Sequence, residues 1–404
     1  MLINFTTYDE FVEEYKNYHY HECLVCGDVR ELTINDLDVS IENRRMHFKD
    51  FLILTCINCG NSCLPQHSKQ MIDGCYKVMV KEGHFEGIQT YNGYKKKFRY
   101  CVDQDFKYDH RDYYNIPGLC FDEEHSEEGF LTPVYFTKKV LLYFMQDPDY
   151  KMDLFSESYG HISFKDEWNI PFGINRNGLV IFWLGDLSYI DSTSLSIMKP
   201  HNIESDHQII DSEYYAAQLG CVWSEPNKEV RVCYKKKELF DQVNIRYNID
   251  LSHLNDEIKD HMRDFRKPVL ITKKSIEPAV NMLHKVLIEG VNINSFRTLY
   301  LELYPKPQKG YKEWKSIKFY QALLERVISE NDDIYEIIAP LYLLNDLRQY
   351  YDHLLSKEKR EHIENNVIKS LGIESFNDID MVYEGLINRL NILFQYLVVG
   401  YSEE

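Results

Sequence analysis

Apolar residues recur every three or four positions through the last third of the chain, and this spacing places them on one face of a helix. Gly290 and Gly372 close two of these segments, as is typical of a helix C-terminus. Pro340 should kink a third segment. The predicted helices span 275–290, 312–328, 332–355, 357–372 and 378–399. Five helices joined by short connections predict a compact bundle.

The middle of the chain has a mixed pattern. An apolar run rich in β-branched and aromatic residues, 178–187, predicts a buried strand, and 230–234 alternates like another strand. The stretch 134–145 has the spacing of an amphipathic helix, whereas 169–178 carries turn residues throughout. We therefore expect this block to be α+β.

The N-terminal part alternates apolar and polar residues between 32 and 55, as in a small antiparallel sheet. Residues 1–20 are expected to form a short helix or a docking arm, and 98–102 has the character of a strand. These patterns predict a multidomain α+β protein. Its three parts are a cysteine-containing module with an N-terminal arm at 1–80, a central α+β module at 81–255 and an all-α bundle at 256–404.

Paired cysteines stand at two expected turns of the N-terminal part, in the strings CLVCG and CINCG. Two thiolates three residues apart can bind one tetrahedral ion, and a glycine after the second cysteine suits a turn that needs a positive φ. The sequence thus predicts a zinc ribbon whose Zn²⁺ is held by Cys23, Cys26, Cys56 and Cys59. Because the protein supplies all four ligands, the ion would be structural rather than catalytic.

Cys63 and His67 lie just downstream, and either could replace a ligand, although packed or surface positions suit both residues better. The segment that includes CGNSCLP resembles the zinc-ribbon domains fused to some bacterial antitoxins and regulators. This resemblance implies a small recognition or dimerisation module.

The formal net charge of −18 excludes a general nucleic-acid coat protein, because two polyanions repel one another. RNA is not excluded as a substrate, since a site needs only local positive charge. Basic residues cluster at 95–99, 235–237 and 306–318, where the simplest interpretation is a solvated face. We see no secretory signal and no apolar run of membrane-spanning length, so we expect a cytoplasmic protein without a membrane partner, whose paired thiols bind metal.

The strongest catalytic signal is NDLRQYYDHLL, at the end of an apolar helix in the C-terminal bundle. An arginine, four further residues and a histidine at this place resemble the signature of the HEPN family, and Arg348 and His353 match it. Gln349 stands where the family often has a polar residue, and Asn345 and Asp352 are polar neighbours that could support the pair. The resemblance covers roughly the last third of the chain and implies a ribonuclease.

The two side chains suit metal-independent cleavage of RNA. Histidine titrates near neutrality and can act as acid or base, while arginine stays protonated and presents a planar fork to phosphate. Five residues along a helix separate Arg348 from His353 by about 140°, so a helix break near Asp352, or a second copy of the motif, is needed to bring them together. HEPN proteins generally dimerise with their motifs facing each other, which implies a homodimer here. The competing interpretation is that Arg348 pairs with an acidic residue and His353 caps its helix.

Other polar residues concentrate in the middle block. Possible metal ligands or acid–base groups are Asp206, His207, Asp211 and Glu213, although a polar loop leading into a helix explains them more simply. A ligand site or a hairpin turn would explain Asn175, Arg176, Asn177 and Asp186, and Tyr159 and His161 are similarly ambiguous.

Together these features predict a metal-independent endoribonuclease of the HEPN type, acting as a bacterial anti-phage or abortive-infection effector or as a toxin. The zinc ribbon and the central module would sense a protein or phage-derived trigger, or regulate the nuclease. The alternative is a non-enzymatic zinc-ribbon binding or regulatory protein, whose HEPN-like bundle is degenerate and serves dimerisation.

Overall fold

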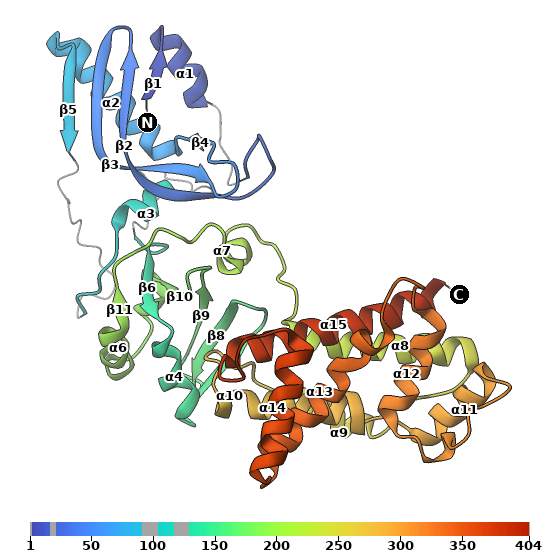
Figure 1. Ribbon diagram of the computed structural model, residues 1–404. Coiled ribbons are helices and arrows are strands. Elements are labelled where there is room, and N and C mark those ends of the chain that lie inside the picture. The colour runs from blue at the N-terminus through green and yellow to red at the C-terminus, as the bar shows by residue number, and fades with distance from the viewer. Residues whose placement is uncertain (1, 17–21, 91–103, 117–128, 404) are drawn as a thin grey trace. The chain divides into compact units, whose positions relative to one another are not determined.

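The computed structural model describes residues 2–16, 22–90, 104–116 and 129–403. It divides into two compact units, Met1–Glu225 and Pro226–Glu404, called here the N-terminal and C-terminal units (Figure 1). The predicted α+β class is confirmed: the N-terminal unit combines strands with helices, and the C-terminal unit is built from helices. The division into three domains stays a prediction.

The first sheet of the N-terminal unit is built on a long antiparallel hairpin. Its strands β2 and β3 confirm the alternation seen in the sequence, and Glu42 and Asn43 form the two-residue loop between Ile41 and Arg44. Both loop residues have positive φ, 48° and 67°, as in the type I′ turns that match strand twist. The strands are β1 (Leu2–Phe5), β2 (Arg30–Ile41), β3 (Arg44–Cys56), β4 (Ser62–Cys63) and β5 (Glu86–Thr90).

Two helices pack against this sheet, α1 (Tyr8–Lys16) and α2 (Gln66–Glu82). Apolar residues of both helices, among them Phe11 and Ile72, share a buried cluster with Val39 and Phe48 of the hairpin. Strand β1 pairs in parallel with β2, so the predicted N-terminal arm is a strand followed by a helix.

The second sheet has the strand order β11-β6-β10-β9-β8-β7. The strands are β6 (Pro133–Thr137), β7 (Tyr150–Leu154), β8 (Tyr159–Phe164), β9 (Trp168–Ile174), β10 (Leu179–Trp183) and β11 (Asn202–Ile203). The helices around it are α3 (His110–Asn115), α4 (Lys139–Gln146), α5 (Leu184–Leu187), α6 (Ser192–Met198), the 3-10 turn η1 (Lys199–His201) and α7 (Glu213–Gln218). Leu32 and Leu54 of the first sheet share a second buried cluster with Tyr135 and Trp183 of the second sheet, so the two sheets pack against each other there.

The C-terminal unit is a bundle around one large apolar core. Its elements are α8 (Lys228–Tyr247), α9 (Asn255–Asp264), α10 (Lys273–His284), the π-helical segment η2 (Lys285–Glu289), α11 (Ile293–Leu303), η3 (Tyr311–Glu313), α12 (Ser316–Val327), α13 (Ile334–Asp352), α14 (Lys357–Leu371) and α15 (Ile379–Glu403). The five helices predicted from the sequence are confirmed, and Gly372 ends α14 with a φ of 68°.

Three local predictions need correction. Residues 230–234 are not a strand but part of α8, and 134–145 divides into strand β6 and helix α4. The stretch 169–178 is mostly strand β9, with the turn confined to its end. Of the predicted buried strand at 178–187, residues 179–183 form β10, whereas 184–187 form the short helix α5. The strand-like 98–102 and the basic cluster at 95–99 lie outside the described residues.

In the described part of the chain, no helix combines the length and the apolar content needed to cross a bilayer.

Candidate functional site

The four paired cysteines converge at one end of the first sheet. The Sγ atoms of Cys23 and Cys59 are 3.6 Å apart, and those of Cys26 and Cys56 are 3.5 Å apart. All four sulfur atoms lie within 4.8 Å of one another. Around a tetrahedral ion with metal–sulfur bonds of about 2.3 Å, the sulfur atoms would be roughly 3.8 Å apart. The cluster therefore has the dimensions of a four-thiolate metal site.

Two similar turns hold the thiols in place. Gly27 and Gly60 follow the second cysteine of each pair with φ values of 75° and 69°, as the sequence predicts. Their backbone N–H groups donate to the carbonyl oxygens of Cys23 and Cys56 at 2.8 and 3.1 Å. Substitution of either glycine would strain its turn, because residues with a Cβ atom rarely adopt positive φ.

Hydrogen bonds to sulfur favour the thiolate form of Cys23 and Cys56, whereas the pKa values of Cys26 and Cys59 are raised. The N–H of Val25 donates to Cys23 Sγ at 3.4 Å, and the Arg30 guanidinium lies 3.9 Å from the same atom. Desolvation acts in the opposite direction, yet the backbone N–H groups of Val25 and Cys26 lower the pKa of Cys23 to about 6. A thiolate is the form that binds metal.

Cys63 and His67 do not join the cluster found among the described residues. Cys63 is buried in β4 opposite Leu54, and burial raises its pKa to about 11. His67 lies in α2, where burial lowers its pKa. Neither therefore replaces one of the four cysteines, in line with the simpler interpretation of both residues.

Arg348 and His353 come together at the end of α13. The helix ends at Asp352, and His353 is extended, with φ −120° and ψ 149°. This break brings His353 Nε2 to 3.4 Å from Arg348 Nη1. Asp352 Oδ2 lies 3.1 Å from Arg348 Nε, so the guanidinium contacts a carboxylate and an imidazole at once. His353 is exposed and the Arg348 side chain is 32% exposed, so solvent reaches both.

A second histidine, which sequence reasoning missed, lies close enough to Arg348 to respond to its charge. His284 is buried, with Nε2 3.4 Å from Asn345 Oδ1 and Nδ1 3.3 Å from a carboxylate oxygen of Glu289. Burial lowers the pKa of His284, against the opposing effects of Asn345 and Glu289, and the nearby charge of Arg348 lowers it further. His284 thus links α10 to the candidate catalytic helix.

The π-helical segment η2 explains why His284 and Glu289 meet. Residues five apart face each other across a π turn, and the N–H of Gly290 donates to the carbonyl of Lys285 at 2.7 Å, which is such a bond. Asn281 in the preceding helix donates to Asp352 Oδ1 at 2.8 Å. No local sequence signal marks these contacts, because the partners lie 61 and 71 positions apart.

The remaining supporting residues contribute less. The N–H of His353 donates to the carbonyl oxygen of Gln349 at 3.2 Å, so Gln349 closes the last helical turn through its backbone. Asn345 and Asp352 contact the site directly, as described above.

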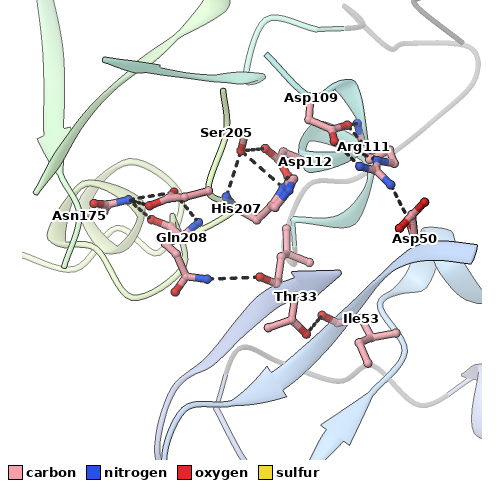
Figure 2. Close-up of polar contacts among 12 residues, drawn as sticks. Thr33, Asp50, Ile53, Asp109, Arg111, Asp112, Asn175, Ser205, His207 and Gln208 are labelled. Carbon is pink, nitrogen blue, oxygen red and sulfur yellow. Dashed lines mark hydrogen bonds and ion pairs between the residues drawn. The ribbon is translucent and has the colours of Figure 1, made fainter. Parts of the chain in front are cut away.

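The polar residues of the middle block form a second, mostly buried network (Figure 2). Asp112, at the start of α3, has no exposed surface and accepts from His207 Nδ1 at 2.6 Å and from the Ser205 hydroxyl at 2.6 Å. Ser205 and Asp112 approach the same ring nitrogen of His207, since Ser205 Oγ is also 3.4 Å from His207 Nδ1. This is not a nucleophile–base–acid relay, in which serine and carboxylate contact opposite ring nitrogens.

The rest of the network fastens the loop at 204–212 to both sheets. Asn175 Nδ2 donates to both Asp206 oxygens, at 3.1 and 2.9 Å, at the turn between β9 and β10. Gln208 Nε2 donates to the carbonyl of Leu32 at 3.4 Å in the first sheet (Figure 2). Arg176 lies 3.2 Å from the buried Glu31 carboxylate. These residues have a structural role in the described chain, as the simpler sequence interpretation proposes.

Glu213 and His161, two further sequence candidates, have polar contacts with other parts of the N-terminal unit. Glu213 accepts from the hydroxyl groups of Ser156 and Ser158 at 2.7 and 2.6 Å. His161 lies 3.9 Å from Asp153, and burial raises the pKa of Asp186 to about 6.

Comparison of the chain with family models, with curated proteins and with solved structures finds no match.

Proposed function

We propose that the C-terminal unit is a metal-independent endoribonuclease with its active site at Arg348 and His353. One observation carries the proposal: α13 stops at Asp352, so an exposed imidazole lies 3.4 Å from a partly exposed guanidinium. An uninterrupted helix would separate the two side chains by about 140°. The motif and its place in a helical bundle resemble the HEPN family.

The proposed reaction needs no metal ion. Neutral His353 takes the proton from a ribose 2′-hydroxyl, and this oxygen attacks the adjacent phosphorus atom. The bond from phosphorus to the 5′-oxygen breaks, leaving a 2′,3′-cyclic phosphate and a 5′-hydroxyl that has received a proton from an acid. Arg348 stabilises the negative charge that develops on the phosphate. In a homodimer of the kind that HEPN resemblance implies, the histidine of a second copy would be that acid.

The start of α14 supports binding of the phosphate. Ser356 caps this helix only three residues after His353, and a helix N-terminus carries partial positive charge. Its first turn contains Lys357, Lys359 and Arg360 together with Glu358, so the turn carries a net positive charge. Local positive charge of this kind favours an RNA backbone although the whole chain carries a net charge of −18.

For the four-cysteine cluster we propose a structural Zn²⁺, because zinc prefers a tetrahedral set of thiolates. The N-terminal unit would then act as sensor or regulator of the nuclease, in a bacterial anti-phage, abortive-infection or toxin role. A protein or phage-derived molecule would be the trigger.

The test is RNA cleavage by the purified full-length protein in EDTA, with metal content measured to show that the cysteine site stays loaded. We expect His353→Ala and Arg348→Ala each to lower the rate by about 10²-fold or more. His261→Ala, which removes an exposed histidine on α9, should leave the rate unchanged. Equal cleavage by wild type and His353→Ala would refute the proposal.

One observation favours the non-enzymatic alternative. Arg348 and Asp352 form an ion pair four residues apart on one helix, an ordinary surface-stabilising arrangement. In that case the bundle would serve dimerisation and binding, and wild-type protein would retain RNA or a protein partner without cleaving it.

A further inference from the structure

Lys236 is a buried cation in the C-terminal unit, remote in sequence from the proposed nuclease residues. Lys236 lies on helix α8 and is only 5% exposed. The ammonium group donates to the carbonyl oxygen of Gly290 at 3.0 Å and lies 4.3 Å from the centre of the Phe240 ring. Within the described residues it forms no ion pair, unlike the neighbouring Lys237, which pairs with Asp241 at 2.6 Å. A buried charge without a counter-ion is costly.

The Lys236 side chain lines a pocket of about 490 Å³ between α8, α9 and η2. Its apolar wall comes from Phe240, Ile258, Met262 and Val286, and Ser252 and Asn255 add polar groups. The volume lies in the usual range for small-molecule sites. Gly290 packs closely against the wall residue Ile258, because a Cβ atom at Gly290 would meet Ile258 Cδ1 at 2.3 Å.

We propose that this pocket binds a small amphipathic carboxylate, whose anionic end pairs with Lys236 and whose apolar tail lies along Phe240, Ile258 and Met262. The ligand supplies the direct ion-pair partner that Lys236 lacks among the described residues. An apolar wall facing a single buried cation selects for one negative charge attached to a hydrocarbon. A fully polar anion would leave the apolar wall in contact with water. This site is independent of the proposed nuclease activity.

The electrostatics of the pocket predict a proton linkage. Burial lowers the pKa of Lys236 to about 8, against opposing effects from Cys233 and Asp250. Cys233 is buried with its pKa raised to about 12, and the pocket also contains Lys237, Asp241 and Lys259. Lys237 and Lys259 have carboxylate partners of their own. An anion beside Lys236 would raise its pKa, so binding near pH 8 takes up a proton.

The experiment is calorimetric titration of the full-length protein with octanoate, octanol and acetate. We expect saturable octanoate binding, weakened about tenfold or more by Lys236→Met, which removes a charge–charge contact. Lys237→Met removes a lysine of the same pocket that already has a partner, and should change the affinity less than about threefold. Acetate lacks the apolar tail and octanol the charge, so both should bind more weakly than octanoate.

A second measurement keeps the proposal testable if Lys236→Met does not fold. Titration of wild-type protein at pH 8, in buffers of different ionisation enthalpy, should show proton uptake on octanoate binding. The proposal is overturned by absence of saturable binding, by octanol binding as tightly as octanoate, by unchanged affinity in a folded Lys236→Met, or by octanoate binding without proton uptake.

Discussion

The Glu31 side chain is buried beside Arg176, with only 1% of its surface exposed. Burial raises its pKa from 4.5 to about 7. Since the folded state then binds more protons than the unfolded chain between these values, the stability of the N-terminal unit should fall as the pH rises through this window. We expect Glu31→Gln to remove this fall and to stabilise the unit at pH 8 by roughly 1–3 kcal/mol.

Urea unfolding of the N-terminal unit in the full chain, at pH 5 and at pH 8, measures this effect. The two proteins should differ at pH 8 and be nearly equal at pH 5. A variant that keeps the pH dependence of the wild type would show that another group is responsible.

His207 and Asp112 form a second buried pair in the N-terminal unit. Burial alone would lower the pKa of His207, but the hydrogen bond and charge of Asp112 raise it above its usual value. The pair therefore contributes stability that is present below about pH 6.5 and is lost as the pH rises through the folded-state pKa. His207→Ala should destabilise the unit at pH 6 by roughly 3–5 kcal/mol, because it leaves Asp112 buried beside Ser205 alone.

A double-variant cycle tests that explanation. If Asp112 and His207 act as a pair, Asp112→Ala combined with His207→Ala should cost clearly less than the sum of the two single changes. Additive losses in urea unfolding would contradict it, since each residue would then act through other contacts.

At the residue scale, the sequence predicts sites whose spacing is local. Cys23 and Cys26 lie on one turn, and their glycine has the positive φ that the turn requires. His284 and Asn345 meet only because α10 packs against α13, which brings them together across 61 positions. Such a contact has no signature in a single sequence, so the support around Arg348 could not be predicted.

At the scale of elements, glycines test how tightly the second sheet is packed. A Cβ atom at Gly173 in β9 would lie 2.3 Å from Tyr214 Cβ, whereas one at Gly74 in α2 would meet nothing within 4 Å. Gly173→Ala should therefore destabilise the N-terminal unit by about 1–3 kcal/mol. Gly74→Ala should stabilise it by about 0.5–1 kcal/mol, since alanine suits a helix better than glycine. Thermal unfolding of both variants checks the contrast, and equal shifts would show that Tyr214 moves aside without cost.

The prediction of helices and strands from the sequence failed where the local preference of the residues disagrees with their packing in the fold. Pro171, Gly173 and Asn175 indicate a turn, yet β9 is a strand because it pairs with both β8 and β10. The alternation at 230–234 suits a strand, but Val232 and Cys233 lie with Leu239 and Phe240 on the buried face of α8. Long periodic segments such as 332–355 were predicted well, since their pattern extends over several turns.

At the scale of the whole molecule, the two units have separate hydrophobic cores. The buried cluster of the C-terminal unit contains residues from α8 to α15 only. The first sheet packs its own cluster around Phe48 and Ile72, and its hairpin is joined at one end by the four cysteines. Loss of the metal should therefore destabilise the N-terminal unit and leave the stability of the C-terminal unit unchanged.

Metal removal tests this division. A bound tetrahedral ion ties Cys23 and Cys26, before β2, to Cys56 at the end of β3, and binding of a structural zinc contributes on the order of 10 kcal/mol to the folding of small domains. In Cys56→Ser, or after strong chelation, amide exchange should accelerate in β2 and β3 while α10 and α13 keep their protection. Cys75→Ser is the matched control, because Cys75 lies in α2 outside the cluster and should leave one ion per chain. Faster exchange throughout α13 would mean that the C-terminal unit depends on the metal, and slow exchange everywhere would mean that the thiols need no ion to hold the hairpin.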